Sequence, residues 1–312
     1  MNEMRSDRAT ARQDGRRLAT AHLSSPSTAL RSASDGTVSP VHMPRMSPPP
    51  MRAARQQVAD STSAALRRDA RRDLAVAAVG LLLVAPAVAW AVGLGADYVA
   101  KALLWFALGL TLVWYGLRTG AHPHARFGDA NRVTLLRLAL AGLLVALLRE
   151  PVWTAAAPAD GHTMLAWAVV ASATNTAVLD AVDGPLARRS GLASPFGARF
   201  DMETDAAFIL VLCALVWQAD QAGLWVLAAG LMRYVFVAAG WRWRWLAAPL
   251  PPSRRRQTVC VMQIVSLIVC LAPVVGSALS TALAAVSLTL LSLSFAIDVH
   301  QLAQTRPHRP EI

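Results

Sequence analysis

Residues 164–218 read MLAWAVVASATNTAVLDAVDGPLARRSGLASPFGARFDMETDAAFILVLCALVWQ, which is two apolar runs joined by a polar connection that carries four aspartates. The flanking runs, residues 164–180 and 200–218, approach the roughly 20 residues that a helix needs to cross hydrocarbon. The stretch therefore predicts two membrane helices with a cluster of carboxylates where one helix ends and the next begins.

Further apolar runs lie on both sides of this stretch. With 55% hydrophobic and only 16% charged residues among 312, the chain is too apolar for a water-soluble globular protein. We therefore predict an all-α, polytopic transmembrane helix bundle. Its eight candidate spans are residues 74–95, 99–117, 133–148, 164–180, 200–218, 222–240, 258–276 and 279–297.

Basic residues are distributed unevenly between the two ends of these spans. One side of the membrane receives fifteen arginines, and the other receives only Lys101 and Arg149. Because arginine-rich loops stay in the cytoplasm, we expect both termini on the cytoplasmic side of the inner (plasma) membrane. Topology then explains the net charge of +11, so no nucleic-acid partner is expected. The fifteen are Arg118, Arg126, Arg132, Arg137, Arg188, Arg189, Arg199, Arg233, Arg242, Arg244, Arg254, Arg255, Arg256, Arg306 and Arg309.

The amino-terminal 72 residues differ in composition from the rest. Residues 1–50 are rich in Ser, Ala, Pro and Arg and have no apolar periodicity, which predicts a disordered basic tail. Residues 52–73 are rich in alanine but have only a thin apolar stripe. This pattern leaves open whether the tail of residues 1–72 ends in a helix at the membrane surface.

The four aspartates have helical spacing. Asp180 and Asp183 are three residues apart, and Asp201 and Asp205 are four apart, so each pair projects from one face of its helix. Unpaired carboxylates at membrane depth are costly, so the cluster must bind cations or protons or open to water. All-oxygen ligation without Cys or His indicates Mg²⁺ or Mn²⁺, and two such ions would neutralise the four charges.

Small residues and one arginine accompany the aspartates. Gly184, Ala187 and Gly197 leave room for a bulky ligand to approach the backbone, and Arg188 provides a positive charge that suits a phosphate. Together with the carboxylates, these residues indicate metal-assisted phosphoryl transfer, in which a carboxylate takes the proton of the acceptor.

The whole stretch resembles the signature of the CDP-alcohol phosphotransferase (CDP-alcohol phosphatidyltransferase) family. The pattern is Asp, two residues, Asp-Gly, two residues, Ala-Arg, eight residues, Gly, three residues, Asp, three residues, Asp, and residues 180–205 match every fixed position. Upstream, residues 131–137 (NRVTLLR) are similar to the start of the first core helix of that family. Ala130 stands where proline is more usual, which is a minor departure.

The resemblance implies a domain organisation. A six-helix catalytic core would occupy residues 121–300, with its active site at the cytoplasmic face and residues 301–312 as a cytoplasmic tail. Residues 73–120 would form two accessory transmembrane helices outside the shared core, after the tail of residues 1–72.

The resemblance also implies roles for individual residues. Asp180, Asp183 and Asp201 would bind the metal ions, and Asp205 would contribute to that site and act as the general base. The CDP pocket would be lined by Gly184, Ala187 and Gly197. Nucleotide or phosphate contacts would come from Arg188, Asn131 and Thr134.

The activity implied is a step of phospholipid biosynthesis. A CDP-linked lipid such as CDP-diacylglycerol would donate its phosphatidyl group to the hydroxyl of a polar acceptor and release CMP, and the enzyme would be a homodimer in the bilayer. Glycerol 3-phosphate is one acceptor, and inositol phosphate, serine or a second lipid are alternatives that use the same aspartates. A carboxylate-lined metal ion transporter is a different reading, which the apolar middle of the spans disfavours.

Several charged and aromatic residues outside the signature allow two interpretations. Arg233 lies inside a predicted span and either extends to the interface or binds the phosphate of the acceptor. Glu203 is two residues from both Asp201 and Asp205, which predicts that it points away from them. Trp243 and Trp245 alternate with arginines, as interfacial anchors do.

Overall fold

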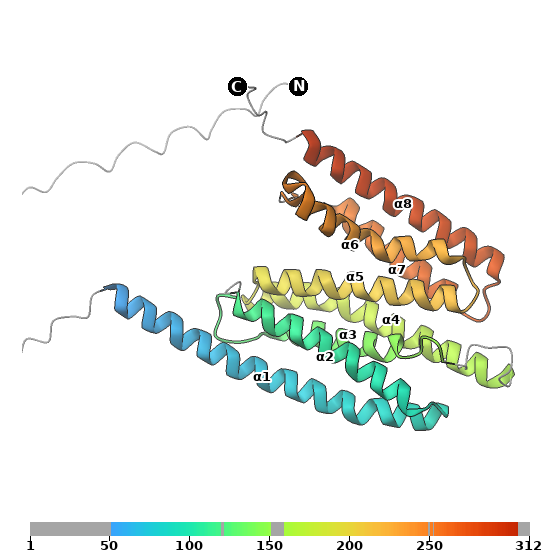
Figure 1. Ribbon diagram of the computed structural model, residues 1–312, viewed down its shortest axis with the longest axis horizontal. Coiled ribbons are helices and arrows are strands. Elements are labelled where there is room, and N and C mark those ends of the chain that lie inside the picture. The colour runs from blue at the N-terminus through green and yellow to red at the C-terminus, as the bar shows by residue number, and fades with distance from the viewer. Residues whose placement is uncertain (1–50, 120–121, 151–158, 249, 252, 305–312) are drawn as a thin grey trace, which may run out of the picture. The chain divides into compact units, whose positions relative to one another are not determined.

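The computed structural model describes residues 51–119, 122–150, 159–248, 250–251 and 253–304. Within these ranges the chain is helical and contains no strand, which confirms the predicted all-α fold class. The expected disorder of residues 1–50 lies outside the described part of the chain. Of the predicted tail of residues 301–312, residues 301–304 belong to the last helix and the rest lies outside the described part. Figure 1 shows the helices in chain order.

The described residues form eight α helices, which correspond one to one with the eight apolar runs. Short 3₁₀ turns, η2 and η3, precede and follow α6. The helices are α1 (Met51–Val92), α2 (Ala96–Arg118), α3 (Asp129–Val145), α4 (Ala159–Ser190), α5 (Pro195–Gln218), η2 (Leu224–Val226), α6 (Leu227–Arg242), η3 (Arg244–Ala247), α7 (Arg254–Cys270) and α8 (Ser277–Gln304).

In the part of the chain that the structure describes, five stretches of helix are long and apolar enough by themselves to cross a bilayer: Arg55–Val92, Ala96–Arg118, Thr163–Ala181, Leu224–Arg242 and Ser277–Gln304. The chain is therefore a multi-pass membrane protein. The other three helices are less typical of membrane spans. α3 and α7 have only 17 residues each, and α5 carries an arginine and three acidic residues near its start.

The first helix is longer than the apolar run that it contains. α1 is one continuous helix of 42 residues, so residues 52–73 are an extension of the first span and not a separate surface helix. At about 1.5 Å per residue it is roughly 60 Å long, about twice the thickness of the hydrocarbon core. Good helix formers, mainly Ala, Arg, Gln and Leu, explain why the helix continues through this polar segment.

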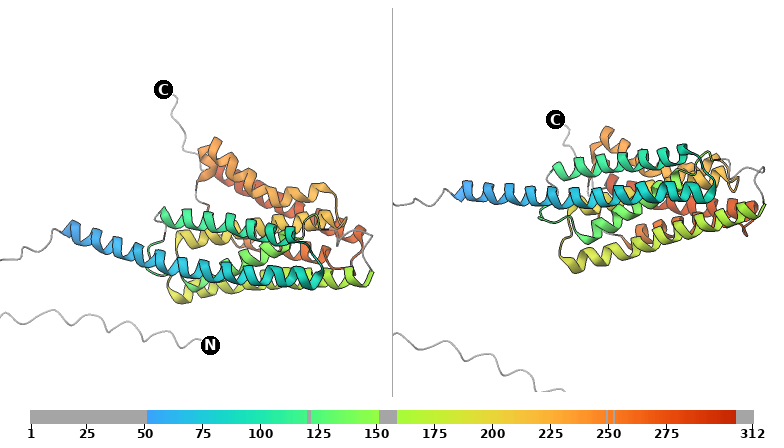
Figure 2. Two further views of the ribbon diagram at one scale, coloured as in Figure 1. Left: turned by 60° about the horizontal axis from the view of Figure 1, so that its bottom comes forward. Right: turned by 90° about the horizontal axis from the view of Figure 1, so that it is seen from below.

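α3 lies at the centre of the amino-terminal part of the bundle. It packs against α1, α2, α4 and α5, while α5 also contacts α6 and α7, and α7 pairs with α8. Figures 1 and 2 show α3 between these neighbours from three directions. Leu135, Leu138 and Ala141 of α3 are buried in this contact together with Phe208 and Leu212 of α5. This packing determines which polar side chains of α3, α4 and α5 can meet.

Small residues allow some of these helices to approach closely. A Cβ atom on Gly230 of α6 would lie 2.6 Å from the Cα atom of Leu210 in α5. That distance is too short for two carbon atoms, so only glycine fits at position 230. Close backbone approach at glycine is a common way for membrane helices to pack, because apolar burial alone does not hold helices together in lipid.

Candidate functional site

The structure brings together three of the four signature aspartates. Asp180 lies in the carboxy-terminal half of α4, and Asp201 and Asp205 lie one turn apart in α5. Each provides a carboxylate oxygen, and these three oxygens lie within 4.8 Å of one another. The face of α5 that carries Asp201 and Asp205 therefore meets Asp180 of α4.

A buried arginine lies among these carboxylates. Arg137 of α3 has no exposed surface, and its Nη1 is 2.8 Å from Oδ1 of Asp180 and 2.6 Å from Oδ1 of Asp201. Its Nη2 donates to Oδ1 of Asp205. Arg137, which is counted above among the fifteen arginines of one side, therefore lies inside the bundle and not in a loop, because α3 packs against α4 and α5.

The charge balance of the cluster remains negative. Three ionised carboxylates and one guanidinium carry a net charge of −2, which equals the charge of one divalent cation in magnitude. The aspartate side chains are 21% to 37% exposed although Arg137 is fully buried. The carboxylates thus pair with Arg137 on the side that faces the inside of the bundle, and their other side remains accessible to a ligand.

The donor set fits a hard divalent cation. All three side chains offer carboxylate oxygen, which suits Mg²⁺ and Mn²⁺ better than zinc. Asp180, Asp201 and Asp205 are the described residues that can hold such an ion. The side chains of Asp183, Ala187 and Arg188 lie outside the described residues, so for these three only their position in α4 is known.

A pocket of about 240 Å³ adjoins the carboxylates. Asp201 belongs both to the carboxylate cluster and to the wall of the pocket. The pocket unites four of the predicted ligand-contacting residues from three helices: Asn131 and Thr134 of α3, Gly184 of α4 and Gly197 of α5.

The absence of a side chain at Gly197 shapes this pocket. A Cβ atom there would lie 2.8 Å from Oδ1 of Asn131 and 3.3 Å from Oγ of Ser194. Asn131 is buried, and its Nδ2 donates to the carbonyl oxygen of Phe127. A larger residue at position 197 would therefore displace Asn131 or occupy the space of a ligand.

A histidine that the sequence reasoning missed stabilises the start of α5. Ser194 caps this helix by accepting a hydrogen bond from the N–H of Gly197 at 3.0 Å, and its Oγ is 2.7 Å from Nδ1 of His122. Nε2 of His122 is 2.8 Å from the carbonyl oxygen of Arg126. A neutral imidazole satisfies both contacts, donating from Nε2 and accepting at Nδ1. Burial lowers the pKa of His122 below 6.5, which agrees with this neutral form.

Glu203 and Arg233 form a pair beside the cluster. Nη2 of Arg233 in α6 lies 2.5 Å from Oε1 of Glu203 in α5. Glu203 therefore faces α6 and not the other carboxylates of α5, as its spacing predicts. Arg233 is a partly buried interhelical residue, with 25% of its side chain exposed.

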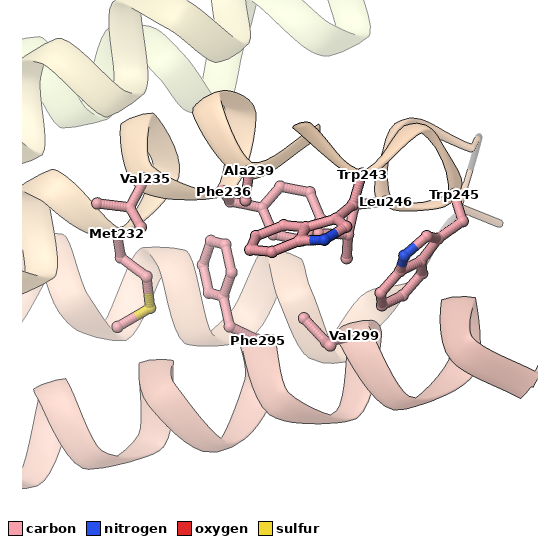
Figure 3. Close-up of a pocket in the computed structure, with 9 residues that line it drawn as sticks. All are labelled: Met232, Val235, Phe236, Ala239, Trp243, Trp245, Leu246, Phe295 and Val299. Carbon is pink, nitrogen blue, oxygen red and sulfur yellow. The ribbon is translucent and has the colours of Figure 1, made fainter. Parts of the chain in front are cut away.

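A larger groove, of about 400 Å³, is lined by apolar and aromatic residues and by no acidic or basic side chain. It lies between α6, η3 and α8 and is lined by apolar and aromatic side chains, among them Phe236, Trp243, Trp245 and Phe295 (Figure 3). None of the residues that line it is titratable. Its position among the tryptophans suits a surface in contact with lipid, so we place the chemistry at the smaller pocket beside Asp201.

Comparison with known proteins agrees with this assignment. The sequence model of one family, described as CDP-alcohol phosphatidyltransferase, matches residues 129–295, which is more than half of the chain. The match begins at the first residue of α3 and contains the three carboxylates and all residues that line the pocket except Phe127 and Gly128. Searches of curated proteins and of solved structures give no significant match.

Proposed function

This chain belongs to the CDP-alcohol phosphatidyltransferase family, and we propose that it moves a phosphatidyl group from a CDP-linked lipid, such as CDP-diacylglycerol, to an alcohol in phospholipid biosynthesis. Membership makes it a membrane transferase of substituted phosphate groups, with a CDP-alcohol donor and an alcohol acceptor. The observation that carries the proposal is that Asp201 joins the carboxylate cluster to a pocket lined by Asn131, Gly184 and Gly197.

Divalent cations would be held by the aspartates. The family generally depends on divalent metal, and the oxygens of Asp180, Asp201 and Asp205 provide a matching donor set. Asp183, one turn from Asp180 in α4, completes the proposed set of four, which has capacity for two ions of Mg²⁺ or Mn²⁺. Bound there, such ions would polarise the phosphate oxygens and stabilise the negative charge of the leaving group.

The pocket would bind the nucleotide end of the donor. Gly184 and Gly197 let the ligand reach the backbone of α4 and α5, while Asn131 and Thr134 face it from α3. Ala187 and Arg188 follow in α4, where Ala187 would line the pocket and Arg188 would contact phosphate. Because the pocket opens beside Asp201, the diphosphate of a bound nucleotide would lie at the carboxylates.

The proton transfer is assigned to Asp205. As the oxygen of the acceptor hydroxyl attacks phosphorus, its proton passes to the Asp205 carboxylate. The bond from phosphorus to the CMP oxygen breaks, and CMP leaves with the electron pair. Arg137 fixes Asp180, Asp201 and Asp205 in one arrangement and reduces their mutual repulsion, so that the geometry exists before the substrates bind.

For the acceptor we propose a phosphorylated polar alcohol, with glycerol 3-phosphate as the first compound to test. The guanidinium of Arg233 lies in α6, next to the helix that carries Asp201 and Asp205, and pairs with Glu203 at 2.5 Å. The phosphate of the acceptor would replace Glu203 as the partner of this guanidinium. Inositol phosphate presents the same chemistry, whereas serine or a second lipid would not use Arg233 in this way.

The orientation follows from the distribution of arginine. We propose that the termini, the basic loops and the carboxylates lie on the cytoplasmic side of the inner membrane, and that residues 121–300 form the catalytic core. Residues 73–118 supply the apolar part of α1 and all of α2 as accessory spans. We also propose a homodimer, whose subunits would each carry a complete site.

The test is a transfer reaction with purified protein. CDP-diacylglycerol, Mg²⁺ or Mn²⁺ and a set of acceptors are incubated with the protein in detergent, and CMP and the lipid product are measured. We expect CMP release that requires an acceptor, stops with EDTA and is lost in Asp205→Asn. Absence of CMP formation with every acceptor, combined with metal uptake into proteoliposomes, would establish the transporter alternative instead.

A further inference from the structure

The accessory helix α1 contacts the chain where the family core begins. Oδ2 of Asp69 accepts a hydrogen bond from the backbone N–H of Phe127 at 2.8 Å. One turn later, Oδ2 of Asp73 lies 2.8 Å from Nε of Arg132. Asp69 and Asp73 are four residues apart and share one face of α1, so α1 makes both contacts from a single face.

The second contact continues into α3. Nη1 of Arg132 also lies 2.7 Å from Oδ1 of Asp129, so the guanidinium joins Asp73 of α1 to the first turn of α3. The Asp73 side chain is only 14% exposed, whereas that of Arg132 is 47% exposed, so the ion pair lies at the edge of the bundle. α1 is thus attached to the start of α3 by two neighbouring polar contacts.

The segment that α1 holds is the turn that leads into α3, and its backbone N–H at Phe127 needs an acceptor. Gly128 follows Phe127 with a φ of 92°, a conformation that favours glycine, and it caps the start of α3. A buried backbone N–H at such a turn requires an acceptor, because an unpaired polar group that has lost its water destabilises the fold. Phe127 is fully buried, and the Asp69 carboxylate provides that acceptor.

Phe127 links this contact to the pocket. Its carbonyl oxygen accepts a hydrogen bond from Nδ2 of Asn131 at 2.5 Å, which leaves Oδ1 of Asn131 directed toward Gly197. Phe127, Asn131 and Gly197 all line the pocket of about 240 Å³. The peptide on each side of Phe127 is therefore fixed, by α1 through the N–H and by Asn131 through the carbonyl oxygen.

We propose that α1 completes the nucleotide pocket, with Asp69 as a positioning residue that acts through Phe127 on Asn131. This inference rests on the proposed function for the identity of the ligand, a cytidine nucleotide. It gives the first accessory helix, which lies outside the family match at residues 129–295, a role in substrate binding as well as in membrane anchoring.

The test measures CMP binding to the full-length protein in detergent with Mn²⁺ present. Asp69→Ala removes the acceptor, and we expect it to weaken CMP binding about tenfold, in keeping with the loss of one charge-assisted hydrogen bond. Asp69→Asn keeps an acceptor oxygen and should weaken binding less than about threefold. Asp60→Ala, which removes an exposed carboxylate elsewhere on α1, is the matched control and should bind CMP like the unmodified protein.

Turnover provides a second measurement. Asp69→Ala should raise the KM for the CDP-linked donor more than it lowers kcat, and Asp69→Asn should restore most of the loss. A helix that serves only as an anchor predicts loss of thermal stability in both variants without change in nucleotide affinity.

The outcomes separate this inference from the function on which it rests. If the unmodified protein fails to bind CMP, the proposed function itself is wrong. If it binds CMP and Asp69→Ala binds it equally well, only the inference is overturned. Should Asp69→Ala not fold, Asp73→Ala replaces it, with an expected weakening of about threefold, and unchanged affinity in that variant overturns the inference.

Discussion

Nη1 of Arg137 lies 2.6 Å from Oδ1 of Asp201, although 64 residues separate them in the chain. The guanidinium is fully buried, and it contacts Asp180 and Asp205 as well. Arg137 therefore acts as a permanent internal cation for a cluster that would otherwise carry three uncompensated charges near the membrane.

Replacing Arg137 should affect the metal dependence of stability as well as turnover. We expect Arg137→Gln to lower kcat about 100-fold, because the carboxylates lose the group that holds their arrangement. With its net charge changed from −2 to −3, the cluster should depend more on bound metal. The increase in the melting temperature caused by Mg²⁺ should thus be larger than in the unmodified protein.

Arg255→Gln is the matched control for that experiment. Arg255 of α7 pairs with the buried Asp298 of α8 at 2.5 Å. Its loss should reduce stability without changing the response to Mg²⁺. An Arg137→Gln protein that responds to Mg²⁺ no more strongly than Arg255→Gln would contradict the assigned role.

A methyl group at position 197 tests the shape of the pocket. In Gly197→Ala the new Cβ would lie 2.8 Å from Oδ1 of Asn131, so one of the two groups must move. We expect the affinity for CMP to decrease about tenfold, in line with the usual cost of overpacking. The affinity can be measured by calorimetry. Gly80→Ala in α1, where a Cβ meets no atom within 4 Å, should leave CMP binding unchanged.

Stability should fall at mildly acidic pH because of His122. Burial lowers the pKa of this histidine below its ordinary 6.5, so the unfolded chain binds the proton more readily than the folded protein. Its contribution is fully present above pH 6.5 and is lost as the pH falls from 6.5 toward the lowered pKa. The melting temperature should therefore decrease between pH 7.5 and 5.5.

Glutamine substitutions isolate this histidine from the others. In His122→Gln, the amide can still accept from Ser194 and donate to the carbonyl oxygen of Arg126, but it does not titrate. The pH dependence of the melting temperature should be weaker in that variant. His124→Gln, at a half-buried neighbouring position whose Nε2 lies 3.2 Å from the carbonyl oxygen of Ala193, should keep most of the dependence of the unmodified protein. Identical curves for all three proteins would exclude His122 as the source.

The acceptor can be examined through Arg233. If the acceptor carries a phosphate, Arg233→Ala should raise its KM by about tenfold or more while changing the KM of the CDP-linked donor little. Glu203→Gln removes the partner at 2.5 Å but keeps the guanidinium, so it should not raise the KM of the acceptor. Unchanged acceptor kinetics in Arg233→Ala would refute this role and favour an uncharged acceptor.

Most of the fold could be predicted because it depends on local composition. Each apolar run became a helix, and the helical spacing of Asp201 and Asp205 placed both carboxylates on one face of α5. The packing of the amino-terminal half of α1 could not be predicted. Its alanine content favours a helix, but its thin apolar stripe does not indicate that this helix packs against the rest of the protein. Its docking depends on Asp69 and Asp73, whose partners lie more than 50 residues away.

By itself, the sequence determined the class of the protein and the residues around which its chemistry is organised, because hydropathy and helical periodicity act within a single helix. Tertiary structure alone decided which helices face one another. In the folded chain Arg137 contacts three aspartates, Asn131 lies against Gly197, and Asp69 accepts a hydrogen bond from the N–H of Phe127. These contacts depend on how α1, α3, α4 and α5 pack, and no spacing within one helix encodes that packing.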